Sequence, residues 1–212
     1  MGPVAPGSLV TIYGSGLAVT TQTANSTPWG INLGGVSVTV NGAAVPIYYA
    51  SSGQMNIQLP YETRPGTATV SVTGACGASV PVAFLVAQAA PYIFQTADGS
   101  AILQNQDLSI NGANRPAKAG SVVTVYLTGI GPLDHPVTTG NAAPATVLSR
   151  ATLPVHVTIG NFDTTVQFLG LTPGFIGLAQ ANLFVPNLSP GKYAIVISIG
   201  GIASNPATMF VQ

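Results

Sequence analysis

The chain has 212 residues, of which only 5% are charged, and five basic and five acidic residues cancel to a formal net charge of zero. Nucleic acids and anionic membrane surfaces both require clustered basic residues, so this composition excludes them as partners. Apolar residues make up 47% of the chain. The longest apolar run, residues 80–90, is nevertheless too short and too interrupted to insert into a membrane.

In chain order, the residue pattern of the first half predicts short strands separated by turns. No stretch of the sequence has the periodicity of an amphipathic helix. Asn41-Gly42 is the clearest turn signal, because this dipeptide favours a two-residue hairpin. Pro60 ends an alternating segment, since proline cannot donate to a strand ladder. The predicted strands of this half are residues 7–13, 36–40, 44–49, 54–60, 69–72 and 80–86.

The second half repeats the first in the same order. Residues 7–13 match residues 120–126 at an offset of 120 − 7 = 113, and residues 54–60 match residues 180–186 at an offset of 180 − 54 = 126. Each copy has roughly 90 residues and many short strands, which suits an immunoglobulin-sized sandwich. We therefore predict an all-β fold of two tandem immunoglobulin-like β-sandwich domains, at residues 1–88 and 89–212.

The two copies differ at their front ends. Residues 91–95 and 101–103 precede the second copy and predict a first strand and a following hairpin, within a segment at 89–118 that belongs to domain two. The first copy has only residues 1–6 before Gly7, so its sandwich is predicted to lack a first strand. Such a sandwich exposes unpaired backbone and an apolar groove. We expect residues upstream of this sequence to supply that strand, and their addition to raise the melting temperature of domain one.

Two motifs carry a family resemblance. Residues 10–17, Val-Thr-Ile-Tyr-Gly-Ser-Gly-Leu, and the later Asn41-Gly42 resemble the opening of IPT/TIG immunoglobulin-like domains. The whole chain also resembles a C-terminal β-domain family of secreted acidobacterial proteins, through residues 6–8, 33–36, 54–60, 101–105 and 173–175. The resemblance implies the sandwich fold, an extracellular or cell-surface setting and partners that are other domains of a longer chain. It supplies no catalytic residue.

Titratable residues are too few and too scattered to predict a catalytic site. Asp134-His135 with Ser149 has the residue types of a hydrolase triad, but the chain has no Gly-x-Ser-x-Gly elbow. His156 falls at an outward strand position, and we interpret both histidines as solvated. The carboxylates, which a glycosidase would need in a facing pair, are Glu62, Asp98, Asp107, Asp134 and Asp163.

The sequence also offers few residues for a metal site, a cofactor site or a crosslink. No Asp-x-Asp cluster suggests calcium, and we predict no metal and no cofactor. Lys118 and Lys192 adjoin turns, which disfavours an isopeptide crosslink. The single Cys76 excludes a disulfide within the chain, and two interpretations stay open for it: pairing with another chain or an incidental small residue.

Aromatic residues are the remaining candidates for contact with a ligand or partner. Trp29 follows a polar loop and either stacks on a sugar ring or plugs the end of the sandwich. Of the adjacent Tyr48 and Tyr49, one should face outward, and Tyr61 is expected to be exposed after Pro60. Phe184 occupies the outward position that Gln58 holds in the first copy, so we expect the linker or the other domain to cover it.

These observations favour a non-catalytic structural or adhesive module of a secreted or cell-surface bacterial protein. It would act as a spacer or self-associate through sheet edges, because a nearly uncharged surface has little colloidal repulsion. The alternative is a carbohydrate-binding accessory module that recognises a polysaccharide through Trp29 and exposed tyrosines.

Overall fold

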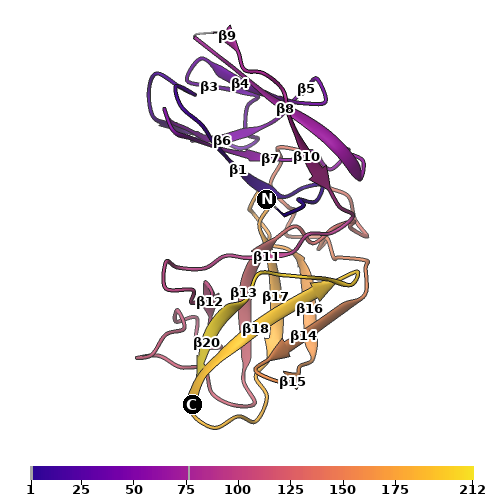
Figure 1. The fold of residues 1–212 in the computed structure, drawn as a ribbon. Helices are drawn as coiled ribbons and strands as arrows, with labels where there is room; N and C mark the ends of the chain where they lie inside the picture. Colours follow the sequence, from indigo (N-terminus) through magenta and orange to yellow (C-terminus); the bar gives the residue numbers. More distant parts are fainter. Residues whose placement is uncertain (1, 76) are drawn as a thin grey trace.

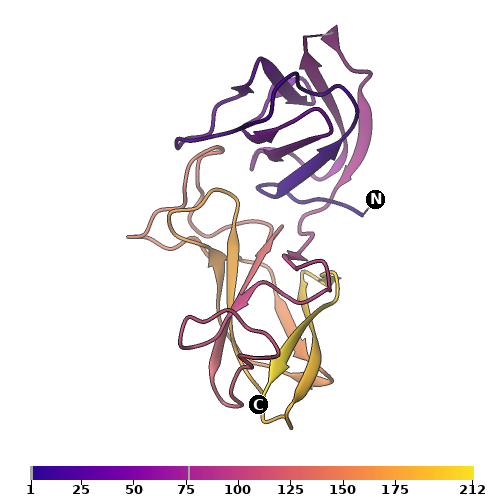
Figure 2. The same ribbon diagram turned by 90° about the vertical axis from the view of Figure 1, so that its left-hand side faces the viewer.

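A computed structural model describes residues 2–75 and 77–212, and shows two β-sandwiches placed end to end. Domain one is the upper half of Figure 1 and domain two the lower half, and a view turned by 90° keeps the same arrangement (Figures 1 and 2). All regular structure in these two ranges is β-strand, so the predicted all-β fold of two tandem immunoglobulin-like sandwiches is confirmed. We keep the proposed boundary at residue 88. Cys76 lies outside the described residues.

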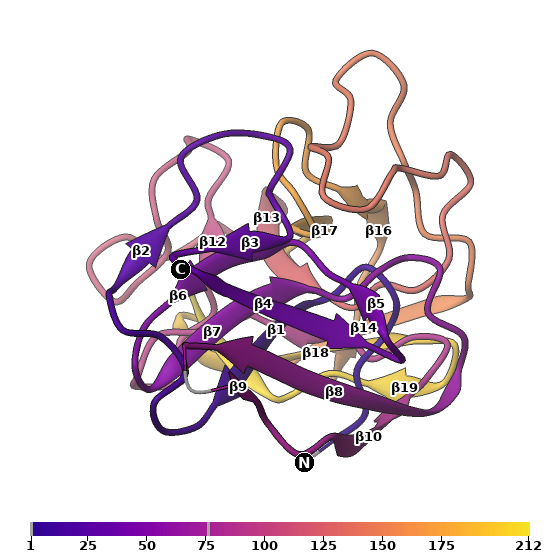
Figure 3. The ribbon, with the colours of Figure 1, turned by 90° about the horizontal axis from the view of Figure 1, so that it is seen from above.

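Domain one consists of two antiparallel sheets. The first has the order β1-β7-β6-β2, formed by β1 (Leu9–Tyr13), β7 (Gln54–Gln58), β6 (Ile47–Ala50) and β2 (Gln22–Thr23). The second has the order β10-β8-β4-β3, formed by β10 (Val82–Val86), β8 (Gly66–Gly74), β4 (Val36–Val40) and β3 (Asn32–Leu33), with β5 (Ala43–Ala44) beside β4 and β9 (Gly77–Ala78) beside β8. Figure 3 looks down on this domain, with β4 and β8 lying side by side.

Domain two repeats the central strands of both sheets, and among the described residues it has no counterpart of β2 or β3. Its first sheet is β11-β13-β17-β16, formed by β11 (Tyr92–Ile93), β13 (Val122–Thr128), β17 (Ala179–Phe184) and β16 (Val166–Leu171), with β12 (Leu103–Gln104) also beside β13. Its second sheet is β15-β14-β18-β19, formed by β15 (Phe162–Asp163), β14 (Val155–Ile159), β18 (Gly191–Ile199) and β19 (Ile202–Ala203), with β20 (Ala207–Val211) beside β18.

The repeated Gln-x-Asn motif forms the same polar ladder in both copies. In domain one, Gln54 Nε2 and Thr11 Oγ1 both donate to Asn56 Oδ1, over 2.9 and 3.2 Å. In domain two, Gln180 Nε2 and Thr124 Oγ1 donate to Asn182 Oδ1 over 3.1 and 3.2 Å. The motif therefore links two neighbouring strands on their outer face while the alternating apolar residues enter the core.

Each domain has its own hydrophobic core. Domain one buries Val38, Ile47 and Met55 completely. Domain two buries a larger set that includes Leu103, Leu127 and Ile197. The two clusters are separate, as a tandem pair of sandwiches requires.

The predicted hairpin at Asn41-Gly42 is present, but the strand after it is shorter than predicted. Both turn residues have positive φ values of 50° and 82°, as a two-residue hairpin demands. The expected strand at 44–49 is wrong as one element: β5 ends at Ala44, and the chain then crosses at Pro46 into β6 of the other sheet. Proline cannot continue a ladder, which explains the break.

The segment at 89–118 contributes β11 and β12 to domain two, and both pair with β13. In Figure 2 this segment, in magenta to pink, runs across domain two. In domain one, Val4 pairs in parallel with Val86, just as Ala117 at the end of this segment pairs in parallel with Val211. The described residues contain no helix that is long and apolar enough to cross a membrane.

Candidate ligand-binding groove at the domain junction

A loop of domain two, residues 134–149, reaches domain one and is held there by its backbone. Trp29 N donates to Gly140 O over 3.0 Å, and Gly140 N donates to Gln58 Oε1 over 2.7 Å. Gly140 has a φ of +85°, and a Cβ at this position would lie 3.1 Å from Pro46 Cγ. One glycine thus provides both a donor and an acceptor to the neighbouring domain, in a conformation that other residues rarely adopt.

Tyr61 anchors the junction from the side of domain one. Its ring packs against the core of domain two, and its backbone N donates to Thr139 Oγ1 over 3.0 Å. Thr139 Oγ1 in turn donates to Glu62 Oε2 over 2.8 Å. Burial raises the pKa of the Tyr61 phenol to about 12. The expectation that Tyr61 is exposed is therefore wrong, because the neighbouring domain covers the corner that follows Pro60.

A second set of contacts lies on the other side of the junction. Leu9 N donates to Thr128 Oγ1 over 2.9 Å, and the same hydroxyl donates to Gly177 O over 3.1 Å. A Cβ on Gly177 would lie 3.0 Å from Gly7 O. Two domains that approach this closely through backbone atoms leave little room for relative rotation.

Beside these contacts, the junction is hollowed into a groove of about 350 Å³. Trp29 and Tyr48 line it from domain one, with their ring centroids 4.8 Å apart at an interplanar angle of 32°. Phe94 and Phe175 line it from domain two, and Phe175 is 56% exposed. The groove thus collects aromatic rings from both domains and exists only while the domains are docked.

Polar groups from β1 and β7 complete the groove. Thr11 and Asn56 both line it. Asn56 Oδ1 accepts two hydrogen bonds, and no described residue accepts from its Nδ2. Aromatic faces with a few fixed polar groups are the usual lining of a site for small amphipathic ligands, including sugars.

The aromatic residues predicted from the sequence separate into three positions. Trp29 and Tyr48 line the groove, and Trp29 is half-buried there. Tyr49 pairs with Thr23 and Asn56 in the sheet, so it projects from the same outer face as the Asn56 ladder and is partly buried there, because a bulge between Ile47 and Tyr49 shifts the register of β6. Tyr61 is partly buried in the junction and does not line the groove.

Phe184 is far from the junction, which corrects the expectation that the linker or the other domain covers it. It is 39% exposed and pairs with Val122, at the opposite end of β13 from the junction residue Thr128. At about 3.3 Å per residue, this end lies roughly 20 Å away from the junction. Its counterpart Gln58 makes the interdomain contact instead.

The residue types of a hydrolase triad meet in one hairpin but do not form a catalytic arrangement. His135 Nδ1 lies 3.1 Å from Asp134 Oδ1 on the surface. Asp134 Oδ1 also accepts from Arg150 N over 2.7 Å, and the resulting pKa of the carboxyl is lowered chiefly by that bond. Ser149 is buried, and its hydroxyl has no hydrogen-bond partner among the described residues. His135 therefore does not activate Ser149 in this structure.

The other titratable residues are equally dispersed. His156 Nε2 lies 2.9 Å from Asp163 Oδ1 on the exposed face of the β14–β15 hairpin. Asp107 shapes a turn, because its Oδ1 accepts from Ser109 N over 3.0 Å. Within residues 2–75 and 77–212, no group of three or more histidine, cysteine, aspartate or glutamate side chains gathers as metal ligands would.

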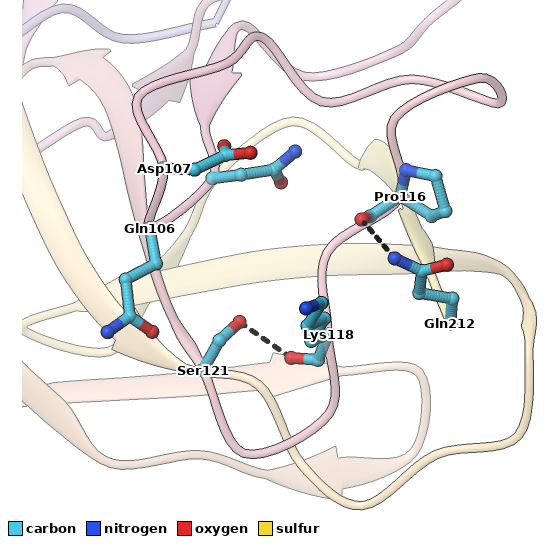
Figure 4. A pocket seen from close by; sticks show the side chains of 7 residues that line it. Gln106, Asp107, Pro116, Lys118, Ser121 and Gln212 are labelled. Atoms are coloured by element: carbon cyan, nitrogen blue, oxygen red, sulfur yellow. Dashed lines mark hydrogen bonds between the residues drawn. The ribbon is translucent and has the colours of Figure 1, made fainter.

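A second hollow, of about 320 Å³, lies at the far end of domain two (Figure 4). Its walls are turns that bond to themselves: Ser121 Oγ donates to Lys118 O over 2.6 Å, and Gln212 Nε2 donates to Pro116 O over 3.5 Å. The side chains of Ser121 and Gln212 thus stabilise the turns that end domain two.

The family model of the IPT/TIG domain matches residues 1–85. This agrees with the resemblance of domain one to IPT/TIG domains, and the strand order shows that domain two is a second sandwich of the same immunoglobulin-like type. The narrower resemblance to an acidobacterial family stays a prediction. A search of curated proteins finds no match to this chain.

Solved structures with a similar fold include several multidomain proteins. SGBP-B of the Bacteroides ovatus mixed-linkage glucan utilization locus, in complex with a mixed-linkage heptasaccharide, is 15% identical, with 99% of this chain and 43% of that chain covered and a TM-score of 0.39. The titin Ig tandem domains A164-A165 are 12% identical, with 84% of this chain and 80% of that chain covered and a TM-score of 0.27. InvD of Yersinia pseudotuberculosis is 17% identical, with 99% of this chain and 55% of that chain covered and a TM-score of 0.27. This chain spans less than half of SGBP-B, and at these TM-scores none of the three indicates what it binds.

Sequence reasoning missed the domain-two half of the junction. Phe175 follows Pro173-Gly174 in a motif that was noted only for its family resemblance, and Gly140 lies in a loop without any alternating pattern. The one available signal for Phe175 was its place directly after the Pro173-Gly174 turn, because turns run over the protein surface.

Proposed function

We propose that this chain is a non-catalytic structural module of a secreted or cell-surface protein, which holds two sandwiches in a fixed relative orientation. The observation that carries this proposal is the junction, where five interdomain hydrogen bonds between described residues accompany a tyrosine that packs against the core of the neighbouring domain. The partners of such a module are other domains of its parent chain. The extracellular setting follows from the resemblance noted above.

The contacts are sufficient for a rigid spacer. A hydrogen bond contributes about 0.5–1.5 kcal/mol net, and about 2.7 kcal/mol already places a two-state equilibrium at 99:1. Docking occurs within one chain, so it avoids most of the entropy cost that separate molecules would incur. The five bonds and the buried Tyr61 ring together therefore favour the docked state strongly.

Removal of the Tyr61 ring tests the spacer. Tyr61→Ala should broaden the distribution of particle dimensions in small-angle scattering and split thermal unfolding into two transitions. Tyr13→Ala is the matched control, since Tyr13 is 77% exposed on β1 and makes no junction contact. A native protein whose scattering requires many interdomain orientations would contradict the proposal.

The aromatic groove favours a second function, recognition of a polysaccharide. Trp29, Tyr48 and Phe175 offer ring faces, and Thr11 and Asn56 offer hydrogen-bonding groups within the same groove. Sugar rings present apolar faces and equatorial hydroxyls, so a site with both kinds of group suits them. Because the walls come from two domains, this function depends on the same junction as the first.

The chain contains one tryptophan, so its fluorescence reports directly on the groove. Titration with mixed-linkage glucan, cellulose and dextran oligosaccharides should shift the emission of Trp29 saturably for at least one of them. Phe175→Ala should weaken that binding about tenfold or more. Phe162→Ala is the control, because Phe162 is 54% exposed, close to the 56% of Phe175, but lies on β15. Unchanged emission with every sugar would remove this function and leave the spacer intact.

A further inference from the structure

Domain one has a deep apolar groove that the corresponding part of domain two lacks. It has a volume of about 400 Å³ and lies between the edge strands β1 and β10, where the two sheets of the sandwich separate. Val40, Ile57 and Leu59 of the core line it, together with Ile12 and Phe84. Apolar surface of this kind on a soluble domain marks an interaction site.

Domain two shows what covers this position. Residues 99–103 lie between β13 and β20 and bond to both. Ala101 N donates to Thr208 O over 2.8 Å, and Thr208 N donates to Gly99 O over 2.9 Å. On the other side, Tyr126 N donates to Ile102 O over 3.1 Å. One inserted strand therefore joins the two sheets.

The side chains of the inserted strand fill the seam. Ala101 and Leu103 are buried in the core of domain two, and the intervening Ile102 faces outward. Beneath them, Val123 and Val125 of β13 are fully buried. An extended strand with apolar side chains at alternate positions is thus the shape and chemistry that closes this sandwich.

The offset between the copies identifies the equivalent groups in domain one. Tyr13 corresponds to Tyr126 (126 − 113 = 13), and Ala83 corresponds to Thr208 (208 − 125 = 83). No described residue pairs with the outer edge of β1 at Tyr13 or of β10 at Ala83. Tyr126 is partly covered and its hydroxyl donates to Gln104 Oε1 over 2.8 Å, whereas Tyr13 is 77% exposed.

We propose that the groove between β1 and β10 binds an extended polypeptide strand, which completes domain one as residues 99–103 complete domain two. The occupant is a polypeptide rather than a sugar or a lipid, because both walls offer unpaired backbone groups at strand spacing above an apolar floor. A second copy of the chain is disfavoured as the donor, since its own strand is already engaged by Leu103 in the core of domain two. This inference is independent of both proposed functions.

A synthetic peptide of residues 90–113 is the probe, because it contains the strand that closes domain two. Titrated into the ¹⁵N-labelled full chain, it should shift the amide resonances of Tyr13 and Ala83 saturably, and leave those of the junction groove unchanged. A peptide that carries Leu103→Asp should bind at least tenfold more weakly, because its charge would have to enter the apolar floor. Ala83→Pro in the protein should also abolish binding, since it removes the outward donor from an edge strand that tolerates proline.

A fusion provides the second measurement. Placing residues 89–116 directly before Val4 reproduces the order of domain two and should raise the melting temperature of domain one by about 4–8 °C, reported by Trp29. The same fusion with Leu103→Asp in the added copy should give no rise. Saturable peptide binding or stabilisation by the fusion supports the inference. The absence of both overturns it, and so does binding that ignores Leu103→Asp and Ala83→Pro.

Discussion

Domain one and domain two share the central strands of both sheets and the same Gln-x-Asn ladder, but they differ where the two sheets meet. In domain two, residues 99–103 close the seam and the core beneath is fully buried. In domain one, the counterparts Val10 and Ile12 are only half-buried at an open groove. A duplicated sequence can therefore keep its ladder and its turns while one added segment decides whether a sandwich is complete.

The two copies also differ at the corner after the second strand of the first sheet. Tyr61 follows Pro60 and enters the neighbouring domain, whereas its counterpart after Pro186 is the exposed Asn187. Gln58 and Phe184 differ in the same sense, since only Gln58 contacts the other domain. Junction residues are thus specific to one copy, although the scaffold that positions them is common to both.

The largest effect is expected from a variant that opens the closed seam of domain two. Leu103→Ala should lower the unfolding free energy of this domain by about 2–5 kcal/mol, because it leaves a cavity between β13 and β20. Urea denaturation followed by far-UV circular dichroism measures this, while Trp29 emission follows domain one. Ile102→Ala, at the outward neighbouring position, should cost less than about 1 kcal/mol. Equal costs for the two variants would show that the segment does not close the core.

A smaller effect is expected from ionisation of the Tyr61 phenol, a group that its counterpart Asn187 lacks. The pKa of Tyr61 is raised from 10.0 to about 12 by burial, so its stabilising contribution is complete below pH 10 and is lost as the pH rises to 12. The native chain should lose about 2–3 kcal/mol more than Tyr61→Phe between pH 10 and pH 12, measured by urea denaturation. Identical pH profiles would mean that the phenol is solvated.

The smallest effect compares two equivalent serines. Ser79 Oγ accepts from Val72 N, and Ser204 Oγ accepts from Ile197 N, both over 3.1 Å. Ser204 is buried and Ser79 is exposed. Ser204→Ala should therefore cost about 1–2 kcal/mol, because it leaves a buried donor without a partner, and Ser79→Ala less than 1 kcal/mol. Thermal denaturation of both variants checks the difference, and a larger cost at Ser79 would contradict it.

The fold could be predicted from the sequence because the turn and strand patterns are local and occur in both copies. Asn41-Gly42 specifies its own turn, and the alternation in residues 54–60 specifies which face is buried, so neither depends on distant residues. The break at Pro46 was harder to predict, because a strand that changes sheets has the same alternation as one that continues. The offsets of 113 and 126 then placed the second copy without further assumptions.

The junction could not be predicted in the same way. Tyr61 contacts Thr139, 78 residues later in the chain, through a backbone donor that no side-chain pattern reveals. Trp29 was singled out from the sequence as a contact residue, which stays a prediction, and its position against Tyr48 depends on the docking of loop 134–149. Long-range contacts between irregular loops have no periodicity, so the aromatic residues could be named but not arranged.

Gly140 joins the two domains through its backbone. Its peptide groups connect Gln58 and Trp29 across the junction, and a side chain there would combine a rarely adopted positive φ with a Cβ only 3.1 Å from Pro46 Cγ. A one-codon change there would weaken the junction at Trp29 and Gln58 without disturbing either hydrophobic core, while the contacts of Tyr61 and Leu9 would stay in place. The strength of the link between the two halves is thus accessible to evolution, and to protein engineering, independently of the stability of each half.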